Sequence, residues 1–161
     1  MDLYQFAMKM EVDGKAFYEK MAAETPHRGL KSVFSMLAAD EQKHYDTIVA
    51  MREGGAVTMA DTTVLENTRN VFEGIRAEKT LAEGLRKEHD AFQYAMKIEA
   101  DSVRLYEDMA KKENDAAIIA LLQKIADEEK KHYNIVENLY DYTLRPEYFL
   151  EWREFSNLKP L

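Results

Sequence analysis

The chain has 161 residues, of which 46% are hydrophobic and 32% charged, and its formal net charge is −8. This length suits one domain with a sizeable core, and the composition is that of a globular protein rather than a disordered one. There is no cysteine, which excludes disulfides, thiolate metal sites and iron–sulfur clusters on these residues. The Lys and Arg residues are interleaved with Glu and Asp, so nucleic acid is not an expected partner.

Apolar runs are short, and the longest clear one is AAIIALL at 116–122. A membrane-spanning helix needs about 20 apolar residues, so we expect no membrane partner. The first residues lack the basic region and the cleavage site of a signal peptide, and we expect a cytoplasmic protein. Six glycines and three prolines are few for this length, which favours long helices over a turn-rich β fold.

Apolar residues at helical spacing predict four long helices, over residues 2–24, 29–52, 85–112 and 115–143. The second is expected to end at Gly54 and Gly55. The long connection that follows contains Leu65 and Phe72 at helical spacing, which predicts a further short helix. Such a connection lets the third long helix start at the same end as the first. We therefore predict an all-α four-helix bundle over residues 1–143, built from two helical hairpins joined by a long crossover, and an aromatic tail over 144–161.

The two predicted hairpins are copies of one another in sequence. DLYQFAMKMEVDGKAFYEKMA at 2–22 aligns without gaps with DAFQYAMKIEADSVRLYEDMA at 90–110. The same offset of 88 places AADEQKHY at 38–45 over ADEEKKHY at 126–133. Over 2–52 and 90–140, about 16 of 51 aligned positions are identical. Two halves, each a helical hairpin, are therefore the simplest interpretation.

Ionisable residues interrupt the apolar stripe of every long helix. The spacing of 3 or 4 residues places them on the inward faces. The six residues are Glu11, Glu41, His44, Glu99, Glu129 and His132. A single Glu-x-x-His is common on solvated faces and a buried histidine is commonly a hydrogen-bonded core residue, but four unpaired carboxylates in one core layer would repel one another.

Two divalent cations would balance these four carboxylates and use both imidazoles as ligands. An oxygen-rich set of this kind suits iron or manganese, and zinc could occupy it as a redox-inactive substitute. We predict a site for two metal ions, with iron favoured because a carboxylate-bridged iron pair can cycle between diferrous and diferric states.

The motifs KMEVDGKAFYEKMA, ADEQKHY, KIEADSVRLYEDMA and DEEKKHY together resemble the rubrerythrin-like branch of the ferritin-like di-iron carboxylate proteins. The resemblance covers about residues 2–140. It implies that Glu41 and Glu129 bridge the two metals, that Glu11 and Glu99 are terminal ligands, and that His44 and His132 each complete one metal site. It also implies a homodimer.

Two features depart from the family. Full-length rubrerythrins carry a cysteine-rich rubredoxin domain, which these residues lack. They also have an extra glutamate three residues after the ligand equivalent to Glu99, where this chain has Ser102. The extra ligand is associated in the family with iron movement during redox change.

Two further pairs of polar residues have two interpretations each. Tyr18 and Tyr106 lie seven residues after Glu11 and Glu99, and they could hydrogen-bond a ligand carboxylate or simply fill core space. Asp40 and Glu128 precede the predicted bridging glutamates. They could orient a histidine of another helix or lie on a solvated flank.

By this resemblance the protein is expected to be a di-iron oxidoreductase that reduces hydrogen peroxide with electrons from an external donor such as a rubredoxin. Glu41, Glu129, Tyr18 and Tyr106 are then the candidate catalytic residues. The alternatives are a ferroxidase that oxidises Fe(II) with O₂ or peroxide, a di-iron oxygenase with an organic substrate, and a metal-stabilised helical adaptor without turnover.

Overall fold

The computed structural model describes residues 1–75 and 84–144 of the chain. The predicted aromatic tail over 144–161 lies outside the described residues apart from Leu144. The helices are, in chain order, α1 (Leu3–Glu24), α2 (Arg28–Glu53), α3 (Val64–Ile75), a single 3₁₀ turn η1 (Arg86–Glu88), α5 (His89–Lys112) and α6 (Ala116–Leu144). The described residues contain no strand, and the prediction of an all-α bundle is confirmed.

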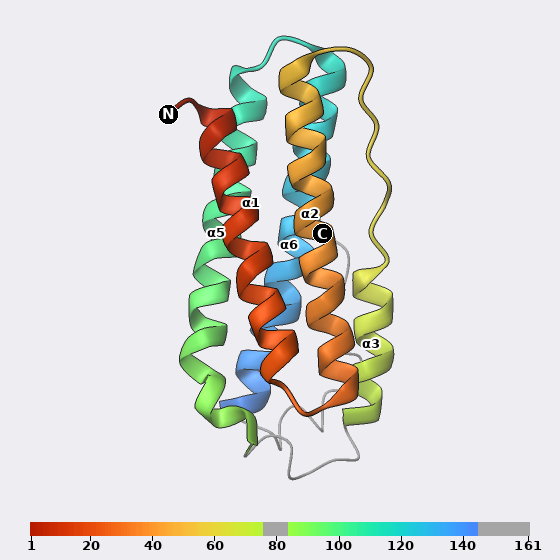
Figure 1. The fold of residues 1–161 in the computed structure, drawn as a ribbon, viewed down its shortest axis with the longest axis vertical. Helices are drawn as coiled ribbons and strands as arrows, with labels where there is room; N and C mark the ends of the chain where they lie inside the picture. Colours follow the sequence, from red (N-terminus) through yellow and green to blue (C-terminus); the bar gives the residue numbers. More distant parts are fainter. Residues whose placement is uncertain (76–83, 145–161) are drawn as a thin grey trace.

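The four long helices form two antiparallel hairpins that pack side by side (Figure 1). One hairpin consists of α1 and α2, and the other of α5 and α6. Residues 54–63 run in an extended path along α2 and lead to α3, which packs against α2 and α6. Buried Val64, Leu65 and Phe72 attach this part of the crossover to the bundle, as the predicted short helix requires.

Local signals set the ends of the first two helices. Asp2 forms a capping box with Gln5 at the start of α1. At the start of α2, Nδ1 of His27 accepts a hydrogen bond from the Leu30 N–H at 3.1 Å, so this histidine acts as the N-cap. Helix α2 ends at Gly54, whose φ of 88° is a conformation that other residues adopt at a cost.

The third long helix starts later than predicted. The sequence pattern places its start at residue 85, whereas the α-helix begins at His89 and follows the 3₁₀ turn of residues 86–88. A 3₁₀ turn and a first α-helical turn repeat apolar residues at nearly the same spacing, so the pattern does not separate them. The other predicted helix ends agree with the structure to within one residue.

The core consists of two apolar layers on either side of a polar one. One layer includes Phe34, Leu37 and Phe92, and the other includes Ile48 and Leu122. Between them each long helix contributes a buried glutamate. None of the described helices is long and apolar enough to cross a membrane.

Candidate metal centre

All six ionisable residues singled out in the sequence come together in the polar layer of the bundle. Each is at most 4% exposed: Glu11 on α1, Glu41 and His44 on α2, Glu99 on α5, and Glu129 and His132 on α6. The helical periods explain this convergence, because Glu and His three apart on one helix lie on the same face. The repeat then supplies the same face from the other hairpin.

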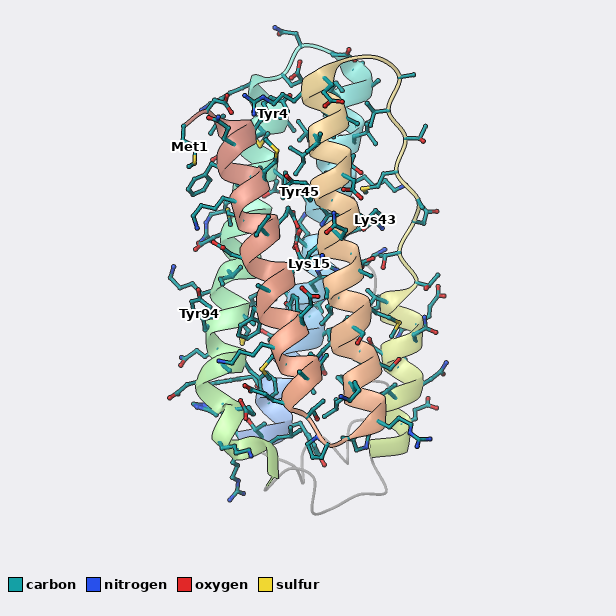
Figure 2. The ribbon with its side chains drawn as sticks, in the orientation of Figure 1. Met1, Tyr4, Lys15, Lys43, Tyr45 and Tyr94 are labelled. Carbon is teal, nitrogen blue, oxygen red and sulfur yellow. The ribbon has the colours of Figure 1, made fainter. Side chains whose placement is uncertain are left out.

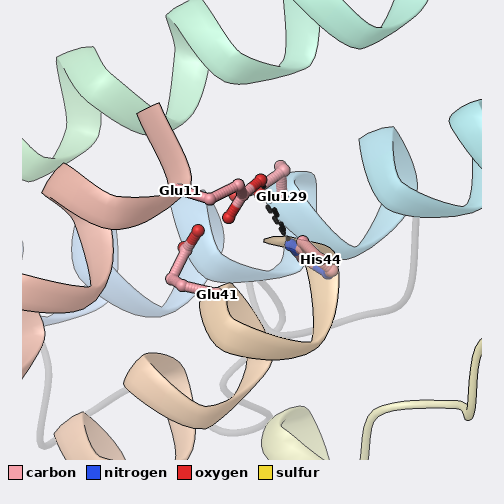
Figure 3. A group of neighbouring side chains, drawn as sticks. All are labelled: Glu11, Glu41, His44 and Glu129. Carbon is pink, nitrogen blue, oxygen red and sulfur yellow. Dashed lines mark hydrogen bonds and ion pairs between the residues drawn. The ribbon is translucent and has the colours of Figure 1, made fainter. Parts of the chain in front are cut away.

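The six side chains form two overlapping sets, each with ligand atoms within 4.8 Å of one another. One set is Glu11, Glu41, His44 and Glu129, and the other is Glu41, Glu99, Glu129 and His132. Figure 3 shows the first set, with the carboxylates of Glu11, Glu41 and Glu129 directed toward one another and the His44 ring beside them. Glu41 and Glu129 belong to both sets. This sharing is what two adjacent metal ions with bridging carboxylates require.

Each histidine directs Nδ1 into the centre and Nε2 away from it. His44 Nδ1 lies 2.8 Å from Glu129 Oε1, and His132 Nδ1 lies 3.2 Å from Glu41 Oε1. The two rings stack with their centroids 5.9 Å apart. Nδ1 is therefore the atom that each histidine can offer to a metal.

The outward nitrogen of each histidine is held by a carboxylate of the other hairpin. His44 Nε2 lies 2.9 Å from Glu128 Oε1, and His132 Nε2 lies 2.9 Å from Asp40 Oδ2. Asp40 and Glu128 are buried, so the orienting interpretation of these two residues fits the geometry and the solvated-flank interpretation does not. A carboxylate on the outer nitrogen fixes the orientation of an imidazole and increases its basicity as a ligand.

The outer carboxylates are supported differently in the two halves. Thr62, from the crossover, donates a hydrogen bond to Asp40 Oδ2 at 2.6 Å. Lys43 forms an ion pair with Glu128 at 2.8 Å and lies 3.6 Å from Asp40. Burial acts to raise the pKa of Asp40, but the bonds from His132 and Thr62 lower it to about 2. The pKa of Glu128 is also lowered, because His44 and Lys43 outweigh the effect of burial.

The two buried tyrosines donate hydrogen bonds across the interface between the hairpins. Tyr18 Oη bonds Glu99 Oε1 at 2.6 Å, and Tyr106 Oη bonds Glu11 Oε1 at 2.5 Å. Burial and the charge of the bonded carboxylate raise the pKa of each phenol well above its ordinary value of 10.0. The tyrosines therefore stay protonated and act as donors, which agrees with the first of their two interpretations.

Crowding of carboxylates controls the electrostatics of the centre. Burial and then the charge of neighbouring carboxylates raise the pKa values of Glu11, Glu41 and Glu99 well above the ordinary 4.5. At Glu129 the effect of burial is outweighed by a hydrogen bond from Glu99 and by the two imidazoles, so its pKa falls well below 4.5.

The imidazoles respond to these carboxylates in turn. Burial acts to lower the pKa of His44, but the charge of Glu129 and the bonds to Glu128 and Glu129 raise it to about 9. The pKa of His132 is raised well above 6.5, because Glu99 and Asp40 outweigh burial in the same way.

The donor set fits metal ions on two observations. Oε2 of Glu11, Glu99 and Glu129 is buried and accepts no hydrogen bond within the described part of the chain. Buried carboxylate oxygens without a partner are costly, and a cation satisfies them. The atoms also have the right chemistry, since four carboxylates and two imidazoles form the oxygen-rich set that iron and manganese prefer.

Sequence reasoning missed Thr62 and Lys43. Thr62 lies in an extended segment that has no counterpart in the repeat, so no periodicity connects it to Asp40. Lys43 follows Asp40 by three residues, a spacing that could have signalled a pairing on one helix face.

An all-α bundle of two repeated hairpins, with buried glutamates and Glu-x-x-His pairs meeting in its core, defines a ferritin-like carboxylate protein. A sequence model of the rubrerythrin family matches residues 2–140, and the chain belongs to that family. This confirms the resemblance seen in the motifs. A search of curated proteins and a search of solved structures return no significant match.

Proposed function

We propose that this chain binds two iron ions in the centre and reduces hydrogen peroxide with electrons from a donor outside its 161 residues. Family membership and the buried carboxylate–histidine cluster support a metal site, and iron with peroxide chemistry is our inference from them. The observation that carries the proposal is that Glu41 and Glu129 belong to both sets of ligand atoms. When bound, an iron pair bridged in this way supplies two electrons, and each peroxide takes these with two protons to give two molecules of water.

In this proposal the six inward residues are the metal ligands. Glu41 and Glu129, which belong to both sets, would hold both ions, and Glu11 and Glu99 would each hold one. His44 and His132 each bind one ion through Nδ1, since their Nε2 atoms are held by Glu128 and Asp40. The Nε2–H of each ring donates to its carboxylate, which leaves the Nδ1 lone pair directed into the centre.

Tyr18 and Tyr106 have a positioning role in the proposal. Each phenol holds its proton at Oη within 2.6 Å of a terminal glutamate, and its raised pKa keeps the proton there at neutral pH. Each hydrogen bond occupies Oε1 of its glutamate, Glu99 for Tyr18 and Glu11 for Tyr106. The other oxygen, Oε2, remains available to a metal.

Stopped-flow absorbance tests the reaction directly. The iron-loaded, reduced protein is mixed with hydrogen peroxide and, separately, with an equal concentration of O₂. We expect faster oxidation by peroxide, and sustained peroxide consumption only when a rubredoxin with its reductase and NAD(P)H is added.

Each other outcome assigns a different function. Oxidation by O₂ at least as fast as by peroxide would replace the proposal with ferroxidase or oxygenase chemistry. No oxidation by either would leave a metal-stabilised adaptor. The expected homodimer and cytoplasmic location stay predictions, the first of which sedimentation of the metal-loaded chain would test.

A further inference from the structure

The internal repeat allows a comparison of the two outer faces of the centre. A groove lies between α1 and α2 on one side of the bundle, and another lies between α5 and α6 on the other. The residues that line the second groove are the repeat equivalents of residues that line the first, 88 positions later. The two grooves therefore occupy matching places on the two hairpins.

The groove between α1 and α2 reaches the candidate ligands. It has a volume of about 340 Å³, and its lining includes both Glu11 and Glu41. Its walls include Val12, Lys15, Gln42 and Tyr45. Figure 2 shows Lys15 and Tyr45 on the face where α1 and α2 lie side by side.

The groove between α5 and α6 stops short of the candidate ligands. It has a volume of about 220 Å³ and is lined by Ala100, Val103, Arg104, Lys130 and Tyr133. Glu99 and Glu129, the equivalents of Glu11 and Glu41, are not among its lining residues. The two equivalent pairs of helices thus differ: the α1–α2 groove extends to two of the candidate ligands, and the α5–α6 groove does not.

Several positions of the repeat differ beside the grooves, and two of them bear on the path to the centre. Position 14 is glycine in the first hairpin, and its equivalent is the buried Ser102. A Cβ at Gly14 would lie 3.3 Å from Cδ and 3.4 Å from Oε2 of Glu41, so the bare backbone accommodates this carboxylate at the base of its groove. Lys15 has Val103 as its equivalent, and Lys15 Nζ donates a hydrogen bond to Gln42 Oε1 at 2.8 Å, which spans the groove from α1 to α2.

We infer that metal ions and a small hydroperoxide reach the centre through the α1–α2 groove, and that the α5–α6 face is closed to them. The inference rests on the proposed function, because it assigns the path to that centre. The polar walls and the Lys15–Gln42 bridge suit a small hydrophilic reactant such as hydrogen peroxide. A bulky alkyl hydroperoxide would have to displace the bridge.

A matched pair of substitutions tests the path. Val12 and Ala100 are equivalent in the repeat, and each lines its own groove. Val12→Trp fills the groove that reaches Glu11, whereas Ala100→Trp fills the one that does not. Ala16→Trp and Arg104→Trp form a second pair at equivalent positions that line the same two grooves, in case one variant of the first pair does not fold.

The first measurement is the rate at which the metal-free protein takes up Co(II), followed by its visible absorption in a stopped-flow instrument. We expect Val12→Trp to slow uptake by about tenfold or more and Ala100→Trp to change it by less than about twofold, because blocking a path acts on the rate. The final amount of bound Co(II) should stay the same in both. The rate of oxidation of the reduced iron form by hydrogen peroxide should follow the same order.

Equal rates in the two variants, or slower uptake in Ala100→Trp, would overturn the assigned path. The proposed function would be overturned by another result, the absence of metal binding in the unsubstituted protein. If the unsubstituted protein binds no Co(II) or Fe(II), the centre itself is not a metal site. The two failures are thus distinguishable within one experiment.

Discussion

The hairpin of α1 and α2 and the hairpin of α5 and α6 agree closely where they face each other and differ where they face away. Toward the centre each contributes two glutamates, a histidine and a tyrosine at an offset of 88 residues. Tyr18 bonds Glu99 of the other hairpin, and Tyr106 bonds Glu11. The outer carboxylate of each hairpin likewise bonds the histidine of the other. Each copy of the repeat is therefore completed by its counterpart.

Away from the centre the equivalence is lost. The outer carboxylate is Asp40 in one hairpin and Glu128 in the other, the first supported by Thr62 of the crossover and the second by Lys43. Of the two equivalent grooves, the one of the first hairpin reaches the glutamates and the other does not. The comparison teaches that the residues in contact across the interface between the hairpins are constrained by each other, whereas their surroundings are free to specialise.

The largest expected effect tests whether Glu129 contributes to the binding of both metal ions. Glu129 belongs to both sets of ligand atoms and Glu11 to one, so Glu129→Gln should weaken binding of both ions and Glu11→Gln chiefly of one. The loss in Glu129→Gln should exceed the roughly 10–100-fold that removal of an outer hydrogen-bond partner costs. Metal analysis after dialysis against a chelator measures the ions retained, with Asp13→Asn on the exposed face of α1 as the control. Equal losses of bound metal in Glu129→Gln and Glu11→Gln would contradict the prediction that Glu129 binds both ions.

Much of this centre can be predicted from sequence because it depends on short periods and on one offset. Spacings of three and four residues place Glu41 with His44 and Glu129 with His132, and the repeat brings the two pairs together. The exchange of partners between hairpins cannot be read in this way, since the bond of Tyr18 to Glu99 depends on how the two hairpins pack. Thr62 and the depth of the grooves depend on a non-repeated segment and on side-chain packing, for which no period exists.

The second prediction concerns the like charges that the two halves bring together. Without metal, the raised pKa values of Glu11, Glu41 and Glu99 mean that the folded state binds more protons than the unfolded state above pH 4.5. The stabilisation that these extra bound protons give the folded state is therefore lost as pH rises from 4.5 toward the raised pKa values. The raised pKa of His44 acts in the same direction: its contribution is complete below 6.5 and is lost as pH rises through about 9.

We therefore expect the metal-free protein to melt at least about 5 °C higher at pH 5.5 than at pH 8.5. The lowered pKa values of Glu129 and Asp40 make stability fall as pH decreases. That effect is confined to pH values below the ordinary carboxyl pKa values and so lies outside the range from pH 5.5 to 8.5. The metal-loaded protein should show the reverse order, because protons compete with metal ions for the same ligands. Calorimetric melting curves measure both, and a metal-free protein that melts higher at pH 8.5 would refute the account of crowded carboxylates.

The third prediction compares the two tyrosines. Tyr18→Phe and Tyr106→Phe each leave a buried carboxylate oxygen without its donor, which costs about 1–3 kcal/mol in free energy of unfolding. If the α1–α2 groove admits water to Glu11 but the other face excludes it from Glu99, Tyr106→Phe should lie at the low end of this range and Tyr18→Phe at the high end. Urea unfolding gives both values, with the exposed Tyr94→Phe as the matched control. A larger cost for Tyr106→Phe would contradict the one-sided access.

The smallest expected effect tests whether the residues that support Asp40 and Glu128 each affect only one of the two histidines. Thr62→Val removes the hydrogen bond to Asp40, the carboxylate that holds His132 Nε2. The cost should be about 0.5–1.5 kcal/mol in the free energy of unfolding. Thr62→Ser keeps the hydroxyl and should restore the loss, which separates the effect of the hydroxyl from that of side-chain size. The same hydroxyl accepts a hydrogen bond from the Val64 N–H at the start of α3, so the measured cost includes both bonds.

The two halves can be observed separately in the Co(II)-loaded protein by paramagnetic proton NMR. Each metal-bound histidine has one exchangeable ring proton, on Nε2, and its exchange rate reports how firmly the outer carboxylate holds it. Thr62→Val should accelerate exchange at His132 alone, because Glu128 and not Asp40 bonds His44. Lys43→Met should act first on His44, since Lys43 lies 2.8 Å from Glu128 and 3.6 Å from Asp40. If Thr62→Val shifts both ring protons equally, the outer residues form one connected network, and the two halves differ in sequence without differing in how they hold the centre.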